Sequence, residues 1–237
     1  MTSSPSAGFD MIAVDWAGTL TLGRHRPDAH LVRQVLTARF GLDISAEFDA
    51  IYDERFWHFY EQSLSTSLAD LLAAVGRLTG TVLPQMSDLT EAIWDACSDH
   101  DLDPLAADAL RELEQRYQVP VWLATNTCRP PEHRARSLVR AGLEFVNPLC
   151  SSAIGAAKPD PLFYRELAAR SGIAPGRTLF IGDRLVPDVL GPADAGMRTV
   201  WINGATDYEA AEHPVPPATI TVPHLSHLPA LLAGGNR

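Results

Sequence analysis

Hydrophobic residues follow two different patterns along this chain. A short apolar run, MIAV, ends at Asp15 and is followed by a Gly18–Thr19 turn, which predicts a buried strand. From residue 22 to residue 101 the apolar positions recur at helical spacing, and no segment there is typical of a strand. Four helices are predicted, opening at Pro27–Asp28 and ending at Gly41, from about Ser45, from Leu68 to Gly80, and from about Ser87. We expect them to form a small bundle.

After Pro104 the pattern alternates between helices and short apolar strands. Strands are predicted near residues 119–125, 145–151, 177–181, 198–202 and 218–222, and helices near 105–117, 130–142, 161–171 and 186–195. Such alternation implies right-handed βαβ units and a parallel sheet with helices on both faces. The predicted fold class is α/β, a doubly wound, Rossmann-like parallel sheet with an inserted helical bundle. We expect an α/β core at residues 9–21 and 102–237, a helical insertion at 22–101 and a flexible tail at 1–8.

Composition and charge narrow the classes of function. Of the 237 residues 46% are hydrophobic, and 19 basic against 29 acidic side chains give a net charge of −10. This charge disfavours nucleic acids and anionic membranes as partners, and no apolar run approaches the length of a membrane span. The three cysteines lack paired spacing, so we expect reduced thiols and a cytoplasmic location. The polar start, MTSSPSAG, is expected to be a loose tail rather than a signal peptide.

Polar residues follow the predicted core strands at four places. Asp15 ends the first strand, Thr125–Asn126 ends the second, Lys158 precedes the next helix, and Asp183 follows a later strand with Asp188 beyond it. Because carboxyl ends of parallel strands share one edge, these side chains should converge. Lys158 is the only lysine among the 19 basic residues, which makes its position before Pro159 informative. The pattern predicts a single polar site at this edge.

The same stretches resemble the four motifs of the haloacid dehalogenase-like superfamily of phosphotransferases and hydrolases. The motifs are DxxGT from Asp15 to Thr19, the apolar strand ending at Thr125, the lysine of AAKPDP at position 158, and GDxxxxD from Gly182 to Asp188. The helical block between the first two motifs is similar to the helical cap of that family. The resemblance covers nearly the whole chain, with the motifs in the family's order.

The resemblance implies a Mg²⁺-dependent hydrolase of a small phosphorylated metabolite that works through an aspartyl-phosphate on Asp15. Lys158 and Thr125 would hold phosphoryl oxygens, which need positive charge and hydrogen-bond donors during in-line attack. The implied metal ligands are Asp15, the backbone carbonyl of Ala17, Asp183 and Asp188. The expected substrate-binding residues are Gly18, Thr19, Asn126, Arg129 and, in the cap, His58.

One position departs from the family. Phosphatases of this family carry a second aspartate two residues after the nucleophile, as general acid and base, whereas this chain has Ala17. Such catalysis contributes roughly 10² to 10⁴ in rate, so a slower enzyme is expected, least affected with leaving groups that need no proton.

Ala17 is also compatible with three other functions. The pentapeptide DWAGT resembles phosphonoacetaldehyde hydrolase, which cleaves a C–P bond, although the cap lysine of that enzyme has no counterpart in residues 22–101. Carbon–halide hydrolysis needs neither the acid nor a metal, which would leave Asp183 and Asp188 without a role. The third possibility is a phosphate-binding protein with little turnover.

Overall fold

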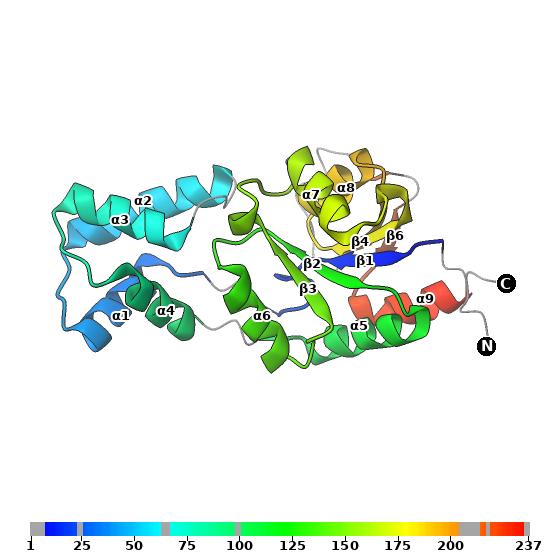
Figure 1. The fold of residues 1–237 in the computed structure, drawn as a ribbon, viewed down its shortest axis with the longest axis horizontal. Helices are drawn as coiled ribbons and strands as arrows, with labels where there is room; N and C mark the ends of the chain where they lie inside the picture. Colours follow the sequence, from blue (N-terminus) through cyan, green and yellow to red (C-terminus); the bar gives the residue numbers. More distant parts are fainter. Residues whose placement is uncertain are drawn as a thin grey trace.

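The core of the protein is a six-stranded parallel sheet with the strand order β3-β2-β1-β4-β5-β6 (Figure 1). The computed structural model describes residues 8–22, 26–62, 67–97, 101–203, 214–216 and 219–234, without the side chains of residues 57–62. The strands are β1 (Met11–Val14), β2 (Val121–Thr125), β3 (Val146–Cys150), β4 (Thr178–Gly182), β5 (Arg198–Ile202) and β6 (Ile220–Val222). The predicted doubly wound α/β class is confirmed.

Strand β1 lies at the centre of the sheet and sets the position of the site. It pairs in parallel with β2 on one side and with β4 on the other, so the strand order reverses beside it. All four of its residues are buried, as expected of a strand covered on both faces. In open α/β sheets, ligands bind in the crevice outside the carboxyl ends of the strands at such a reversal. The residues that follow β1 and β4 lie at this crevice.

Helices cover both faces of the sheet, and alternate residues of β1 point to different faces. Ile12 and Val14 pack into the hydrophobic cluster formed with α5 (Pro104–Tyr117), α6 (Pro131–Arg140) and α9 (Leu228–Gly234). Met11 and Ala13 face the other cluster, against α7 (Pro161–Ser171). Figure 1 shows α5 and α9 on one side of the sheet, and α7 with the short α8 (Gly191–Asp194) on the other. This two-residue alternation is the pleat of a strand.

The segment after β1 forms a separate group of helices beside the sheet (Figure 1). The four helices are α1 (Ala29–Phe40), α2 (Ala46–Gln62), α3 (Leu68–Thr79) and α4 (Met86–Ala96). They share a hydrophobic cluster of their own, in which Phe48, Tyr52 and Leu72 are completely buried. Local signals fix the ends of α1: the Asp28 carboxylate accepts from the Leu31 amide, and Gly41 takes a left-handed conformation with φ 64°. The predicted helical bundle is confirmed.

The prediction and the structure differ at two elements. The expected helix at residues 186–195 is a π-helical turn, Leu185–Leu190, followed by the four-residue α8. Pro192 lacks an amide hydrogen, so a continuous α-helical ladder over these residues would miss a hydrogen bond in its interior. Pro187 would lie in the first turn, where amides have no acceptor within the helix. Helix α9, after the last strand, was not predicted. Among the described helices, none is both long and apolar enough to cross a membrane.

Candidate active site

Asp15 stands at the carboxyl end of β1, immediately before a tight turn. Its backbone amide donates to the carbonyl of Ile181 in β4 (2.9 Å), and the residue is 8% exposed. Gly18 in the turn has φ 89°, and a side chain there would collide with the Asp183 carboxylate. Glycine is therefore required both by the backbone conformation and by the close approach of the loop after β4.

Lys158 joins two of the carboxylates. Its Nζ donates to Oδ1 of Asp15 (2.8 Å) and to Oδ1 of Asp188 (2.6 Å), and its side chain is only 2% exposed. Asn126 fixes the backbone of Lys158 from both sides: its Nδ2 donates to the Lys158 carbonyl (2.7 Å) and its Oδ1 accepts from the Lys158 amide (2.8 Å). The side-chain amide after β2 thus holds the lysine that reaches the aspartate after β1.

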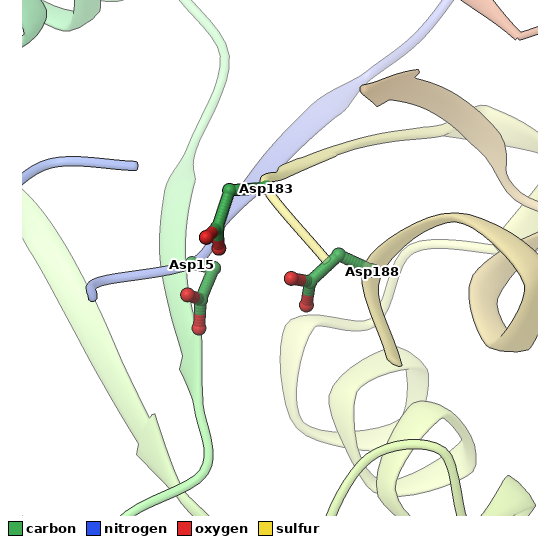
Figure 2. A group of neighbouring side chains, drawn as sticks. All are labelled: Asp15, Asp183 and Asp188. Carbon is green, nitrogen blue, oxygen red and sulfur yellow. The ribbon is translucent and has the colours of Figure 1, made fainter. Parts of the chain in front are cut away.

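Three aspartates form a cluster beside this lysine. One oxygen of each of Asp15, Asp183 and Asp188 lies within 4.8 Å of the others, and Figure 2 shows the three carboxylates gathered around one space. The backbone carbonyl of Asp183 accepts from the indole Nε1 of Trp201 (3.0 Å). Oδ2 of Asp188 accepts from the Arg184 amide (3.1 Å), which ties the carboxylate to its own turn.

The protonation of the cluster is set by burial and by neighbouring charge. Burial raises the pKa of the Asp188 carboxyl to about 7; the Lys158 charge opposes this rise, and the charges of Asp15 and Asp183 support it. Burial lowers the pKa of Lys158, but the carboxylates of Asp15 and Asp188 outweigh burial, so the pKa lies above its usual value. Lys158 is therefore a permanent cation among three acids.

The cluster opens onto a recess that contains about 340 Å³ of empty space, part of it open to solvent. The recess is lined by Asp15, Ala17, Thr125, Asn126, Lys158, Arg184, Pro187 and Asp188. Five of the sequence-predicted positions after strands thus meet, together with Ala17, at one edge of the sheet. Sequence reasoning missed Arg184, although its place directly after the GD pair at the end of β4 was an available signal.

Of the remaining predicted residues, neither Thr19 nor Arg129 lines the recess. Thr19 is buried, and its Oγ1 has no hydrogen-bond partner within the described residues. The Arg129 guanidinium lies over the Trp94 ring (4.5 Å to the centroid) and donates to the Cys97 carbonyl (3.3 Å), so it contacts the end of α4 rather than the recess. The side chain of His58 lies outside the described residues.

The arrangement defines a class of α/β protein in which an aspartate ends the first strand, a lysine bridges it to a second acid, and helices are inserted after that strand. Within this class, residues 9–196 match the family model of the haloacid dehalogenase-like hydrolases, and the chain belongs to this family. The similarity stated from the four motifs is confirmed.

Comparisons with individual proteins are shorter or more distant. A phosphoserine phosphatase from Thermus thermophilus is 34% identical over 118 residues, which is 49% of this chain and 46% of that protein. The chain thus spans less than half the length of this relative.

Two solved structures show the same fold. A 2-haloacid dehalogenase from Pseudomonas syringae pv. Tomato DC3000 has a TM-score of 0.66 at 19% identity, covering 96% of this chain and 99% of that one. An HAD phosphatase from Thermococcus onnurineus has a TM-score of 0.62 at 22% identity, covering 95% and 99%. The two proteins are named for different reactions, so the shared fold does not show which reaction this chain catalyses.

Proposed function

We propose that this chain is a Mg²⁺-dependent phosphatase that hydrolyses a small phosphorylated metabolite through an aspartyl-phosphate on Asp15. The observation that carries the proposal is the meeting of three carboxylates and one buried lysine beside a recess that Asp15, Asp188 and Lys158 line. The phosphatase name of the Thermus thermophilus relative supports the same reaction. The helical insertion, residues 22–101, is proposed to act as a cap over the site.

The carboxylate cluster fits a magnesium ion. An octahedral Mg²⁺ holds oxygens at about 2.0–2.1 Å, so its ligands lie about 3 to 4 Å from one another. Oxygens of Asp15, Asp183 and Asp188 within 4.8 Å of one another can meet this requirement with small adjustments. Ala17 lines the recess, and its backbone carbonyl is proposed as a further ligand. When bound, the ion would supply positive charge opposite the phosphoryl oxygens.

The side chains of the site would supply the nucleophile and the groups that hold phosphoryl oxygens in both halves of the reaction. A carboxylate oxygen of Asp15 attacks phosphorus in line, forming an O–P bond while the bond to the leaving oxygen breaks and its electron pair departs with that oxygen. A water oxygen then attacks the same phosphorus, the bond between phosphorus and the Asp15 oxygen breaks, and the proton of the water passes to bulk water, which releases phosphate and restores the Asp15 carboxylate. Lys158 orients Asp15 through its 2.8 Å hydrogen bond, and Lys158 with Thr125 would hold phosphoryl oxygens.

The presence of alanine rather than an acid at position 17 suggests a second candidate function. Among the described residues lining the recess, the carboxylic acids are Asp15 and Asp188, and Lys158 donates to both. A leaving group that departs without a proton therefore suits this site best. The DWAGT pentapeptide favours C–P cleavage in a phosphonate as the alternative, and the absence of lysine from residues 22–101 opposes it.

A panel of phosphate esters, assayed with Mg²⁺ and with the ion removed by chelation, tests the proposal. We expect turnover that needs Mg²⁺ and that is abolished by Asp15→Asn. Asp10→Asn is the matched control, because Asp10 is an exposed aspartate just before β1. Phosphate binding without turnover would instead indicate a binding protein. Phosphate release from phosphonoacetaldehyde but from no ester would indicate the C–P reaction.

A further inference from the structure

A tyrosine of α7 donates a hydrogen bond to the π-helical turn that carries Asp188. The Tyr164 hydroxyl donates to the Pro187 carbonyl (2.6 Å), and the tyrosine is only 1% exposed. Pro187 directly precedes Asp188, whose carboxylate belongs to the acidic cluster. A buried side chain outside the recess therefore contacts the backbone next to an acid inside it.

The turn lacks a backbone donor for this carbonyl at the position where a π-helix would supply one. The Gly191 amide donates to the Val186 carbonyl, the five-residue spacing of a π-helix. In the same register, the Pro187 carbonyl would accept from residue 192, which is a proline without an amide hydrogen. The Tyr164 hydroxyl takes the place of the missing donor.

The ring of Tyr164 is fixed by its neighbours. It packs edge-to-face against Phe180 of β4, with ring centroids 6.0 Å apart, and a side chain at Gly191 would collide with its hydroxyl. The hydroxyl is thus confined between the sheet and the turn. Because the Pro187 carbonyl and the Asp188 amide share one planar peptide unit, fixing the carbonyl oxygen also fixes the start of the Asp188 residue.

We propose that Tyr164 is a positioning residue that sets the place of Asp188 for metal binding, through the carbonyl of Pro187. The inference rests on the proposed function, in which Asp188 is a ligand of Mg²⁺. Lys158 and the Arg184 amide donate hydrogen bonds to the carboxylate of Asp188, whereas Tyr164 donates to the carbonyl of the residue before it. Outer-shell partners of metal ligands typically change metal affinity by about 10- to 100-fold.

The chain offers a closely matched control in its helical insertion. Tyr52 of α2 is also completely buried, and its hydroxyl also donates to a proline carbonyl, that of Pro27, at 2.6 Å. Tyr52 packs in the insertion's own hydrophobic cluster. Tyr164→Phe and Tyr52→Phe therefore remove the same kind of hydrogen bond, and only the first removes it beside the acidic cluster.

Mg²⁺ is titrated calorimetrically into the full chain and into both variants, and thermal unfolding of each is recorded. We expect similar losses of melting temperature in the two variants but an Mg²⁺ dissociation constant raised about 10- to 100-fold in Tyr164→Phe alone. Adding Pro192→Ala to Tyr164→Phe supplies an amide hydrogen for the Pro187 carbonyl and should recover part of the affinity.

The outcomes separate this inference from the function on which it rests. If Tyr164→Phe binds Mg²⁺ as tightly as the unchanged chain, or if Tyr52→Phe weakens binding equally, Tyr164 has no positioning role. If the unchanged chain itself binds no Mg²⁺, the proposed function fails and this inference with it.

Discussion

Ala17→Asp is the substitution that tests most directly how this site treats its leaving group. Ala17 lies on the wall of the recess, two residues after Asp15. An aspartate there would add a carboxyl group beside the proposed nucleophile. If only the general acid is missing, the gain should equal its usual contribution of about 10² to 10⁴ in rate, or about 3 to 5 kcal/mol of transition-state stabilisation.

The surroundings would also tune the new acid. Asp15, Asp183 and Asp188 lie close together, and Asp15 and Asp188 line the recess with Ala17. At an effective dielectric constant of about 20, one negative charge about 6 Å away destabilises a new carboxylate by about 3 kcal/mol, or about 2 pKa units. Lys158 opposes this effect. A raised pKa brings the acid closer to neutral pH, where a proton donor works best.

Two substrates with different leaving groups make the assay specific. An alkyl phosphate must expel an alkoxide, which needs a proton, whereas nitrophenyl phosphate expels a stable phenolate. We expect kcat/KM of Ala17→Asp to rise about 100-fold or more with the alkyl ester and by less than about tenfold with the aryl ester. Ala169→Asp, on the exposed face of α7, controls for the added charge. No gain, or an equal gain with both esters, would refute the reasoning.

Two further substitutions test the charge balance and the turn. Lys158→Met leaves Asp188 buried without its cation, so we expect a melting temperature lower by about 6–20 °C at pH 8, from about 3–5 kcal/mol. The folded-state pKa of Asp188 is already raised to about 7 and would rise further without Lys158, so the folded variant takes up a proton as pH falls. The loss of melting temperature should therefore be smaller below pH 7 than at pH 8. A loss that does not depend on pH would contradict this. Gly18→Ala should weaken Mg²⁺ binding more than tenfold, because the added methyl group would displace Asp183. Gly155→Ala is the control, since Gly155 has a similar positive φ but open space around it, and it should leave Mg²⁺ binding unchanged. Calorimetric titration of Mg²⁺ checks both variants.

Local signals were sufficient to predict much of the fold. The Asp28 carboxylate and Gly41 close the ends of α1 through contacts within a few residues, so the sequence alone defines them. Helix α7 occupies the predicted residues 161–171 because Pro161 and Gly172 mark its limits. The order of strands and helices then brings Asp15, Lys158 and Asp183 to one edge, since parallel strands share their carboxyl ends.

Contacts between distant segments were beyond prediction. The periodicity of residues 186–195 fits an α-helix, but the turn takes a π-helical register in which Tyr164 supplies a hydrogen bond from another helix. Asn126 was expected to bind substrate, and its amide holds the backbone of Lys158 at 2.7 and 2.8 Å, a pairing across 32 residues. The roles assigned to individual site residues, and the boundaries of the cap, remain predictions.

The balance of charge in the site bears on the choice between phosphoryl transfer and carbon–halide cleavage. Displacing a halide needs one carboxylate nucleophile, so two more acids within 4.8 Å of it would only add repulsion. At an effective dielectric constant of about 20, two like charges about 4 Å apart repel by about 4 kcal/mol, and Lys158 supplies a single compensating charge. A bound divalent cation would be coordinated by the same three oxygens and would offset their mutual repulsion. It would also attract a phosphoryl group, which the carboxylates alone would repel. The acidic cluster is therefore the feature that favours the proposed phosphorylated substrate over a halide.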